Sequence, residues 1–321
     1  MFKEDMKILF LGTPEFAAST LDNLIKSGYK PSLIITSSDK RSGRGKKMQE
    51  SPVSLLAKEK KIETLKPKKI TEIKDRIKKE SFDLAIISAY GQIVPQEILD
   101  MPSKGFLNLH PSLLPKHRGA SPITQTIIDG DKETGATIML LNDKMDEGPI
   151  LKQKKINLTG KEFFQELSMK LISLGSDILI ETIPLWVNGK IKAKEQDHCQ
   201  ATYTKIIKKE DGKINWRDPA YLIEREVRAY SIWPKSFSFY QDKKSGKKKT
   251  MTILDCEIQK QTDVGPFGPV GKTYMATNNK IAVQTGKDFL IIKRLQLENK
   301  KATDVEDFLN GNINFIGTIL K

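Results

Sequence analysis

Short apolar runs alternate with amphipathic stretches over the first part of the chain. Apolar runs of strand length cover residues 7–11, 33–35 and 84–87. Apolar residues recur at helical spacing over residues 17–28, 53–61 and 70–79. Strands that alternate with helices in this way are typical of βαβ units with a parallel sheet. The pattern therefore predicts a Rossmann-like, doubly wound α/β domain with a mainly parallel sheet at the N-terminus.

A further apolar run, residues 106–110, carries two polar side chains. In a strand, successive side chains point to opposite faces, so Asn108 and His110 are expected on one face and Leu107 and Leu109 on the other. An amide would then stand beside an imidazole. A single histidine after a strand is more often a structural residue than a catalyst, although histidine is the commonest general acid or base, so the pattern alone leaves both interpretations open.

Proline and small residues mark where these strands should end. Pro111 cannot donate a hydrogen bond to a neighbouring strand and Pro115 interrupts the chain again, so the run is expected to stop at His110, at a sheet edge that faces a cleft. Residues 88–91, Ser-Ala-Tyr-Gly, follow an earlier apolar run. Because open α/β sheets bind ligands at the carboxyl ends of their strands, the sequence predicts a ligand site at this edge.

The loop at residues 142–149 is rich in carboxylates and follows an expected strand at 135–141. Asp146 could orient an imidazole or take part in proton transfer, and Asp143 and Glu147 compete for the same role. An Asp in a glycine-containing turn usually serves local hydrogen bonding instead. Spacing alone does not choose among the three carboxylates.

The character of the chain changes in its second half. Helices are expected from Ser121 and Pro122 to about residue 129 and over 161–183, and the second of them closes an N-terminal domain of residues 1–190. Residues 191–210 are polar without clear periodicity and indicate a linker. A helix at 220–230 precedes β-rich segments at 236–240, 250–258, 281–284 and 289–297. Residues 211–321 are therefore expected to form a small barrel-like domain.

The net charge of +14 favours polyanionic partners such as nucleic acid. Most basic residues are lysines spread along the chain, and residues 211–321 carry 19 basic and 13 acidic side chains, so local clustering is more informative than the total. Residues 40–47, Lys-Arg-Ser-Gly-Arg-Gly-Lys-Lys, hold five basic side chains around two glycines. Such a segment fits either a solvated surface loop or a flexible loop that orders on RNA.

Several classes of protein are disfavoured. No run approaches the roughly 20 apolar residues of a membrane span, and the start does not have the pattern of a signal sequence, so a soluble, cytoplasmic protein is expected. Cys199 and Cys256 are too few for a disulfide framework, and the three histidines show no metal-ligand spacing, so reduced thiols and no structural metal are expected. Residues 12–15 lack the glycines of a dinucleotide fingerprint and residues 271–273 lack the leading glycine of a phosphate loop, so neither nicotinamide nor ATP binding is expected.

Two motifs resemble the folate-dependent formyltransferase family. The first is residues 108–115, Asn-Leu-His-Pro-Ser-Leu-Leu-Pro, with Arg118-Gly119 after it, and the second is residues 145–149, Met-Asp-Glu-Gly-Pro. Residues 43–47 and 210–216 resemble, more narrowly, the members that act on methionyl-tRNA. The likeness covers nearly the whole chain. It implies transfer of the formyl group of 10-formyltetrahydrofolate to methionyl-initiator tRNA for translation initiation, and a C-terminal OB-like β-barrel that helps to hold the tRNA.

By position, the resemblance also assigns roles to individual residues. Asn108, His110 and Asp146 match the family's catalytic trio, in which an amide and an imidazolium oriented by the carboxylate would stabilise the oxyanion of a tetrahedral intermediate, with no metal required. The folate-binding signature matches Ser112, Leu113, Leu114 and Pro115. The expected contacts with tRNA fall on Arg44, Lys46 and Lys47. The enzyme is expected to be a monomer.

Two departures from the family pattern and two alternative functions remain. His117 stands where the family usually has Trp, and the usual proline before Trp233-Pro234 is missing. A related enzyme that formylates an amino sugar or a purine precursor would use the same trio, but it would need neither the basic loop nor the separate barrel. A noncatalytic RNA-binding protein on the same scaffold would bind RNA without forming a product.

Overall fold

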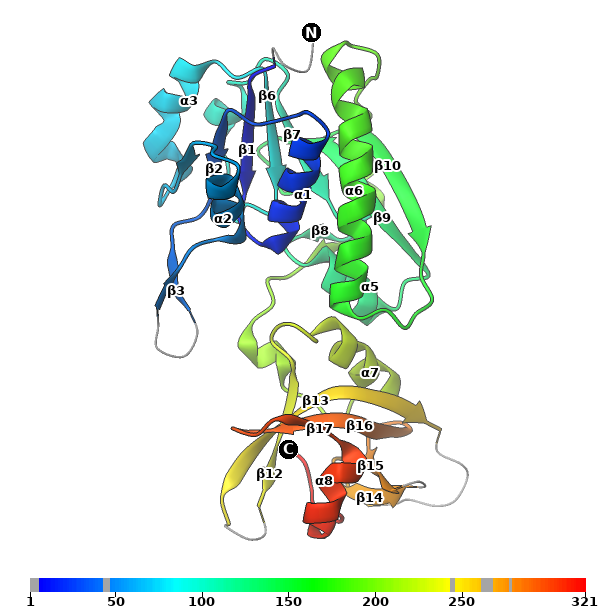
Figure 1. Ribbon diagram of the computed structural model, residues 1–321. Coiled ribbons are helices and arrows are strands. Elements are labelled where there is room, and N and C mark those ends of the chain that lie inside the picture. Colours follow the sequence, from blue (N-terminus) through cyan, green and yellow to red (C-terminus); the bar gives the residue numbers. More distant parts are fainter. Residues whose placement is uncertain (1–5, 43–46, 243–245, 261–267, 277–278) are drawn as a thin grey trace. The chain divides into compact units, whose positions relative to one another are not determined.

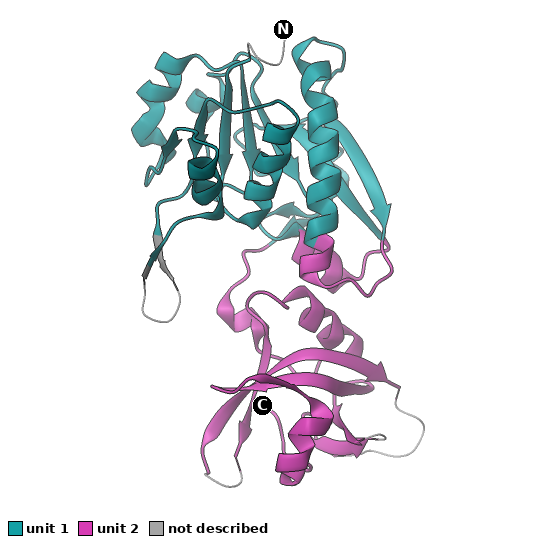
Figure 2. Ribbon diagram, in the orientation of Figure 1, with its two compact units in different colours: residues 1–122, 133–157, 168–204 teal, residues 123–132, 158–167, 205–321 magenta. Residues whose placement is uncertain are grey.

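The computed structural model describes residues 6–42, 47–242, 246–260, 268–276 and 279–321 (Figure 1). The chain forms two compact units, each of which is described by itself (Figure 2). Unit 1 comprises residues 1–122, 133–157 and 168–204. Unit 2 comprises residues 123–132, 158–167 and 205–321. No helix in the described part of the chain is long and apolar enough to cross a membrane.

A seven-stranded sheet forms the centre of unit 1. In spatial order its strands are β10 (Ile150–Asn157), β9 (Glu133–Leu140), β7 (Phe106–His110), β6 (Leu84–Ser88), β1 (Ile8–Gly12), β2 (Leu33–Ile35) and β5 (Thr64–Leu65). The strands from β7 to β5 are parallel, whereas β9 runs antiparallel to both β7 and β10. This arrangement confirms the predicted mainly parallel α/β sheet. β7 is an inner strand between β6 and β9, so it does not form a side edge of the sheet. The edge at which it ends is the one formed by the carboxyl ends of the parallel strands.

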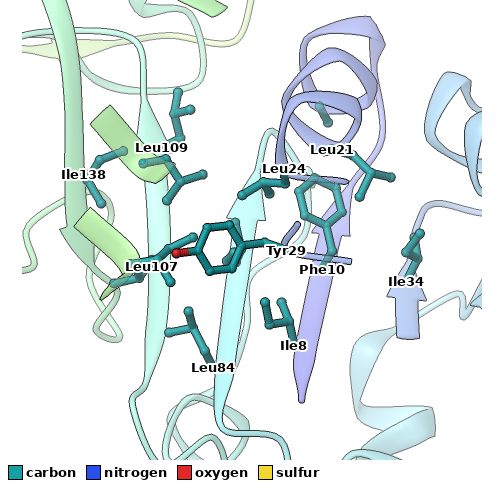
Figure 3. Close-up of a cluster of buried hydrophobic side chains, with 14 of the residues drawn as sticks. Ile8, Phe10, Leu21, Leu24, Tyr29, Ile34, Leu84, Leu107, Leu109 and Ile138 are labelled. Carbon is teal, nitrogen blue, oxygen red and sulfur yellow. The ribbon is translucent and has the colours of Figure 1, made fainter. Parts of the chain in front are cut away.

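Helices cover both faces of this sheet (Figure 1). On one face, α1 (Glu15–Lys26), α2 (Pro52–Glu59) and α6 (Phe164–Val187) contribute to a core cluster that includes Leu107 and Leu109 of β7. Figure 3 shows these leucines packed with Phe10, Leu24 and Ile138. On the other face, α3 (Lys74–Glu80) and α4 (Gln96–Leu99) pack in a second cluster that includes Phe106. Inner strands buried on both faces explain why their sequences are continuous apolar runs.

Two small pairings lie outside the main sheet. β3 (Lys40–Ser42) and β4 (Lys47–Gln49) form an antiparallel pair. β8 (Arg118–Gly119) and β11 (Tyr203–Thr204) pair in parallel. Short 3₁₀ turns lie at Ile70–Ile73, His198–Gln200, Lys209–Gly212 and Ile313–Phe315.

Unit 2 contains an antiparallel half-barrel. Its strands, in spatial order, are β12 (Ser236–Gln241), β13 (Lys248–Gln259), β16 (Phe289–Leu297), β15 (Lys280–Gln284) and β14 (Thr273–Ala276), and β17 (Ala302–Asp304) pairs with β16. Its helices are α5 (Pro122–Asp129), α7 (Ala220–Ala229) and α8 (Val305–Asn312). Register shifts next to Asp255 bend the long strand β13 and help the sheet to curl. The structure confirms the predicted β-rich C-terminal domain.

The polar stretch that was expected to be a linker is ordered against unit 1 as far as Thr204. Lys194 forms a backbone bridge with Ile150, and β11 pairs with β8. The side chains of Gln196, His198 and Tyr203 make hydrogen bonds with Arg118 of unit 1, so the polar composition concealed a structural role. From Lys205 onward the chain belongs to unit 2.

Candidate active site

β7 brings Asn108 and His110 to the carboxyl end of the sheet on one face. Both side chains are largely buried, with 8% of Asn108 and 4% of His110 exposed. Leu107 and Leu109 pack into the core on the opposite face, as strand alternation predicts. The last register pair of β7 with β9 joins His110 to Thr137, so the strand ends where the imidazole stands.

Asp146 lies beside both polar residues. Its Oδ2 accepts a hydrogen bond of 2.7 Å from the backbone N–H of Gly119 and lies 3.6 Å from His110 Nδ1. Its Oδ1 lies 3.5 Å from Asn108 Nδ2. Asp146 has a positive φ of 53°, in the left-handed region that few non-glycine residues adopt. Strain of this kind, about 1 to 2 kcal/mol, persists only where the surrounding contacts hold it.

The imidazole of His110 is held on both sides. Its Nε2 lies 2.9 Å from the carbonyl oxygen of His117, and a carbonyl can only accept, so Nε2 carries a proton. Its Nδ1 faces the carboxylate of Asp146. Both ring nitrogens therefore face oxygen acceptors, an arrangement that accommodates an imidazolium. The contact from His117 comes from its backbone, so it does not depend on the side chain that departs from the family pattern.

The other two carboxylates of the loop lie elsewhere. Asp143 is exposed. Glu147 accepts a hydrogen bond of 3.0 Å from the Tyr203 hydroxyl, and its Oε1 lies 3.3 Å from Arg118 Nη1. Asp146 is therefore the carboxylate of this loop that stands next to the histidine ring.

A buried arginine network supports the loop, and sequence reasoning missed it. Arg118 is completely buried, and its Nε and Nη2 donate to Oε1 of Gln196 at 3.2 and 2.8 Å. Its Nη1 donates to the Tyr203 hydroxyl at 3.0 Å, and Nη2 lies 3.1 Å from Nδ1 of His198. The guanidinium thus joins β8 to the stretch that was expected to be a linker.

Gln196 connects this network to the loop that carries Asp146. Its Nε2 donates to the backbone carbonyls of Asp146 and Gly148, at 2.8 and 2.7 Å. Gln196 is 6% exposed, so it pairs these carbonyls away from solvent. The only signal for Gln196 in the sequence was a polar residue within a polar, aperiodic segment, whereas Arg118 was part of a recognised motif.

The residues of the folate signature form a loop that is fixed from β9 and β10. Ser112 is buried, and its hydroxyl donates to the carbonyl of Lys116 at 2.6 Å, so the side chain is already engaged. The N–H of Leu114 donates to the Thr137 hydroxyl, and its carbonyl accepts from Gln153 at 2.8 Å. Two further residues of the signature, Leu113 and Pro115, are partly exposed. Their side chains are the part of the signature that can offer apolar surface to a ligand.

The structure does not test the three basic residues that were expected to contact tRNA. Arg44 and Lys46 lie outside the described residues. Lys47 is the first residue of β4. Among the residues that the structure describes, no group of three or more His, Cys, Asp or Glu side chains could hold a metal ion.

Comparison with known proteins gives matches over nearly the whole chain. A family model described as formyl transferase matches residues 6–183, and one described as the C-terminal domain of formyl transferase matches residues 206–312. A methionyl-tRNA formyltransferase of Alkaliphilus oremlandii is 37% identical over 98% of this chain and 99% of its own length. Another from Rickettsia bellii is 38% identical over 95% of this chain and 97% of its own length.

A solved structure supports the fold. An N-formyltransferase from Helicobacter canadensis, in complex with folinic acid and dTDP-3-aminofucose, matches with a TM-score of 0.61. The match covers 89% of this chain and 98% of that one at 18% identity, so it is a similarity of fold.

Proposed function

This chain belongs to the formyl transferase family, and from that premise we propose that it transfers the formyl group of 10-formyltetrahydrofolate to the α-amino group of methionyl-initiator tRNA. Relatives named methionyl-tRNA formyltransferase, which align over nearly their full length, support this acceptor. The product, N-formylmethionyl-tRNA, serves translation initiation. The enzyme therefore works in the cytoplasm, and it acts as a monomer.

The observation that carries the proposal is the convergence of an amide, an imidazole and a carboxylate at the end of β7. When the amine nitrogen attacks the formyl carbon, the carbonyl electron pair moves to oxygen and an oxyanion forms. Asn108 Nδ2 donates a hydrogen bond to this oxygen, and the imidazolium of His110 adds positive charge nearby. Asp146 orients the ring through Oδ2, which Gly119 holds in place.

The tetrahedral intermediate then collapses by breaking the bond between the formyl carbon and the folate nitrogen. The attacking amine loses one proton and the departing folate nitrogen gains one, so no proton is gained or lost in the reaction. We assign Asp146 Oδ1 to accept the amine proton. Its hydrogen bond from Asn108 Nδ2 is long, at 3.5 Å, whereas Oδ2 already accepts a 2.7 Å hydrogen bond from the N–H of Gly119. Catalytic hydrogen bonds that are long without substrate commonly shorten when it binds.

The folate signature fits a flat ring system. Thr137 and Gln153 fix the backbone of this loop, and Leu113 and Pro115 keep partly exposed apolar side chains. We assign the folate to this loop, next to the trio. Residues 1–190 then carry the transfer, and residues 211–321 bind tRNA together with the loop of Arg44, Lys46 and Lys47.

One assay tests the reaction. The purified protein is mixed with 10-formyltetrahydrofolate and with either methionyl-initiator or methionyl-elongator tRNA, and N-formylmethionine is measured. Product with the initiator tRNA is expected, and absence of product with both tRNAs would contradict the proposal.

Two variants test the trio. His110→Ala and Asp146→Asn are expected to lower kcat by about 10²- to 10⁴-fold, the usual contribution of acid–base catalysis, with little change in melting temperature. Full activity at saturating substrates in folded variants would show that these residues do not perform the chemistry.

A further inference from the structure

β12 carries two aromatic side chains on the outer face of the unit 2 sheet. Alternation directs Ser236, Ser238 and Tyr240 to the inner face, where their exposed fractions are 2%, 0% and 7%. Phe237 and Phe239 lie between them and are partly exposed. The two rings meet edge to face with their centroids 5.6 Å apart, so they present one continuous aromatic surface.

The neighbouring strand does not explain these rings. On β13, Thr252 lies opposite Phe237 and Thr250 lies opposite Phe239. Short hydroxyl side chains cover little of a phenyl ring, whereas a ring that stabilises a sheet normally packs against aromatic or branched apolar partners. Two outward phenylalanines beside threonines therefore form an apolar patch on a polar face.

Two lysines lie over this patch. Lys248 Nζ is 4.0 Å and Lys213 Nζ is 5.8 Å from the centroid of the Phe239 ring. Among the described residues, neither of these ammonium groups forms an ion pair with a carboxylate, in contrast to the next lysine, Lys249, which pairs with Asp242. The patch thus combines an aromatic surface with positive charge that is not neutralised by the described part of the chain.

We propose that Phe237 and Phe239 form a stacking platform for an unpaired base of the bound RNA, with Lys213 and Lys248 against the adjoining phosphates. The face of a base stacks on an aromatic ring while its phosphate requires a cation, and single-stranded nucleic acid is bound by this combination. A paired base inside a helix has no free face, so the platform selects unpaired nucleotides. The inference rests on the proposed function, because tRNA is the RNA that would supply the base.

Direct binding to RNA probes tests the platform in the full-length protein. Fluorescence anisotropy measures the affinity for a labelled single-stranded RNA decamer of mixed sequence and for a duplex of the same sequence. The double variant Phe237→Leu, Phe239→Leu keeps apolar side chains but removes both rings. It is expected to bind the single strand about tenfold or more weakly, a loss within the range that removal of base stacking causes, and to bind the duplex unchanged.

Two control variants show whether a loss of binding comes from these two rings, rather than from a change in folding or from the removal of any exposed aromatic side chain. The variant Phe237→Tyr, Phe239→Tyr retains both rings and is expected to bind the single strand as the parent does. Tyr221→Leu removes an exposed tyrosine of α7 that lies under Arg225, whose guanidinium donates to the carbonyls of Ile128 and Asp129. This matched variant is expected to leave the affinity for the single strand unchanged.

Equal binding of the single strand by the leucine variant and the parent would overturn the platform, and so would an equal loss on the single strand and the duplex. Neither result involves formyl transfer. A parent protein that forms no N-formylmethionine would contradict the proposed function instead, and the comparison of RNA probes would still decide whether the platform binds bases.

Discussion

Gln196 uses its whole side-chain amide to hold the loop of Asp146. One end accepts from the buried guanidinium of Arg118, and the other donates to the carbonyls of Asp146 and Gly148. Replacement by methionine keeps the length of the side chain but removes the hydrogen-bond partner of Arg118 Nε and of the carbonyls of Asp146 and Gly148. Each such group costs about 1 to 3 kcal/mol. We expect Gln196→Met to lower the melting temperature and to lower kcat by about 10- to 100-fold.

The adjoining segment offers a matched control. Gln200 is exposed and donates to Asp197, so Gln200→Met is expected to leave both the melting temperature and kcat unchanged. Kinetics at saturating substrates, well below the melting temperature of each variant, separate positioning of Asp146 from partial unfolding. A folded Gln196→Met enzyme with the parental kcat would show that the loop keeps its geometry without this contact.

Gly148 gives a second prediction for the same loop. A β-carbon at this position would lie 1.8 Å from the carbonyl oxygen of Leu140, which belongs to β9 and cannot move freely. Gly148→Ala must therefore displace the backbone two residues after Asp146, and we expect a loss of kcat of tenfold or more. In Gly311→Ala the new β-carbon would meet no atom within 4 Å, so a stability and activity close to the parent are expected there.

At this scale the sequence could predict neighbours only within an element. Alternation along β7 placed Asn108 and His110 on one face, and the structure has them there. The choice of Asp146 over Asp143 and Glu147 came from the family resemblance, because the three lie in one irregular loop. Gln196 is 50 residues from Asp146 in the chain, and only the tertiary fold brings them together.

Among the helices, α7 carries a carboxyl group whose ionisation opposes folding. Burial, together with the charges of Asp218 and Asp211 and against that of Lys205, raises the pKa of Glu226 to about 7 from an ordinary value of 4.5. The folded state therefore binds a proton that the unfolded state has released between these two pH values. Because the folded state binds more protons, stability falls as the pH rises through this window.

Glu226→Gln removes this dependence. The variant is expected to exceed the parent by less than about 1 kcal/mol at pH 5 and by up to about 3 kcal/mol at pH 8, since each pKa unit is worth about 1.4 kcal/mol. Urea unfolding at the two pH values measures the difference. A gap that is the same at both pH values would contradict the assignment.

Glu162 provides a control of the opposite sign. Burial alone would raise the pKa of Glu162, but hydrogen bonds from Thr159 and from the Gly160 backbone outweigh it and lower the pKa. Its contribution to stability is therefore present above the unfolded pKa and is lost as the pH falls. Glu162→Gln is expected to destabilise the protein at pH 8 and to do so less at acidic pH.

The elements that sequence patterns revealed are those buried on both faces or along a clear stripe. β1, β2, β6 and β7 are continuous apolar runs because helices cover both sides of the sheet. β10 was missed, since it is an edge strand whose lysines and glutamine are partly or fully exposed and interrupt the apolar pattern. Where one edge and one face of a strand meet solvent, the sequence preference for a strand is weak. Pairing with the neighbouring strand then determines whether a strand forms.

For the whole molecule, the division into two units followed from a change in periodicity, but the boundary did not. The polar segment before Thr204 looks like a linker in composition, whereas its polar groups satisfy the buried Arg118 of unit 1. Burial of an arginine requires such partners, and their identity depends on which segments meet in space. Composition alone therefore indicated a linker in a stretch that belongs to unit 1 as far as Thr204.

The charge of the whole chain leads to a prediction about salt. With a net charge of +14, binding of tRNA releases counterions from its phosphates, so the KM for methionyl-tRNA is expected to rise about tenfold or more between 50 and 200 mM salt. Folate carries few charges, and its KM is expected to change much less.

Arg44→Ala is expected to weaken tRNA use, to reduce the slope of log KM against log salt by about 1 and to leave folate affinity nearly unchanged. A contact with a tRNA phosphate affects the affinity for tRNA alone. An equal loss of tRNA and folate affinity in this variant would therefore mean that Arg44 supports the active site as a whole.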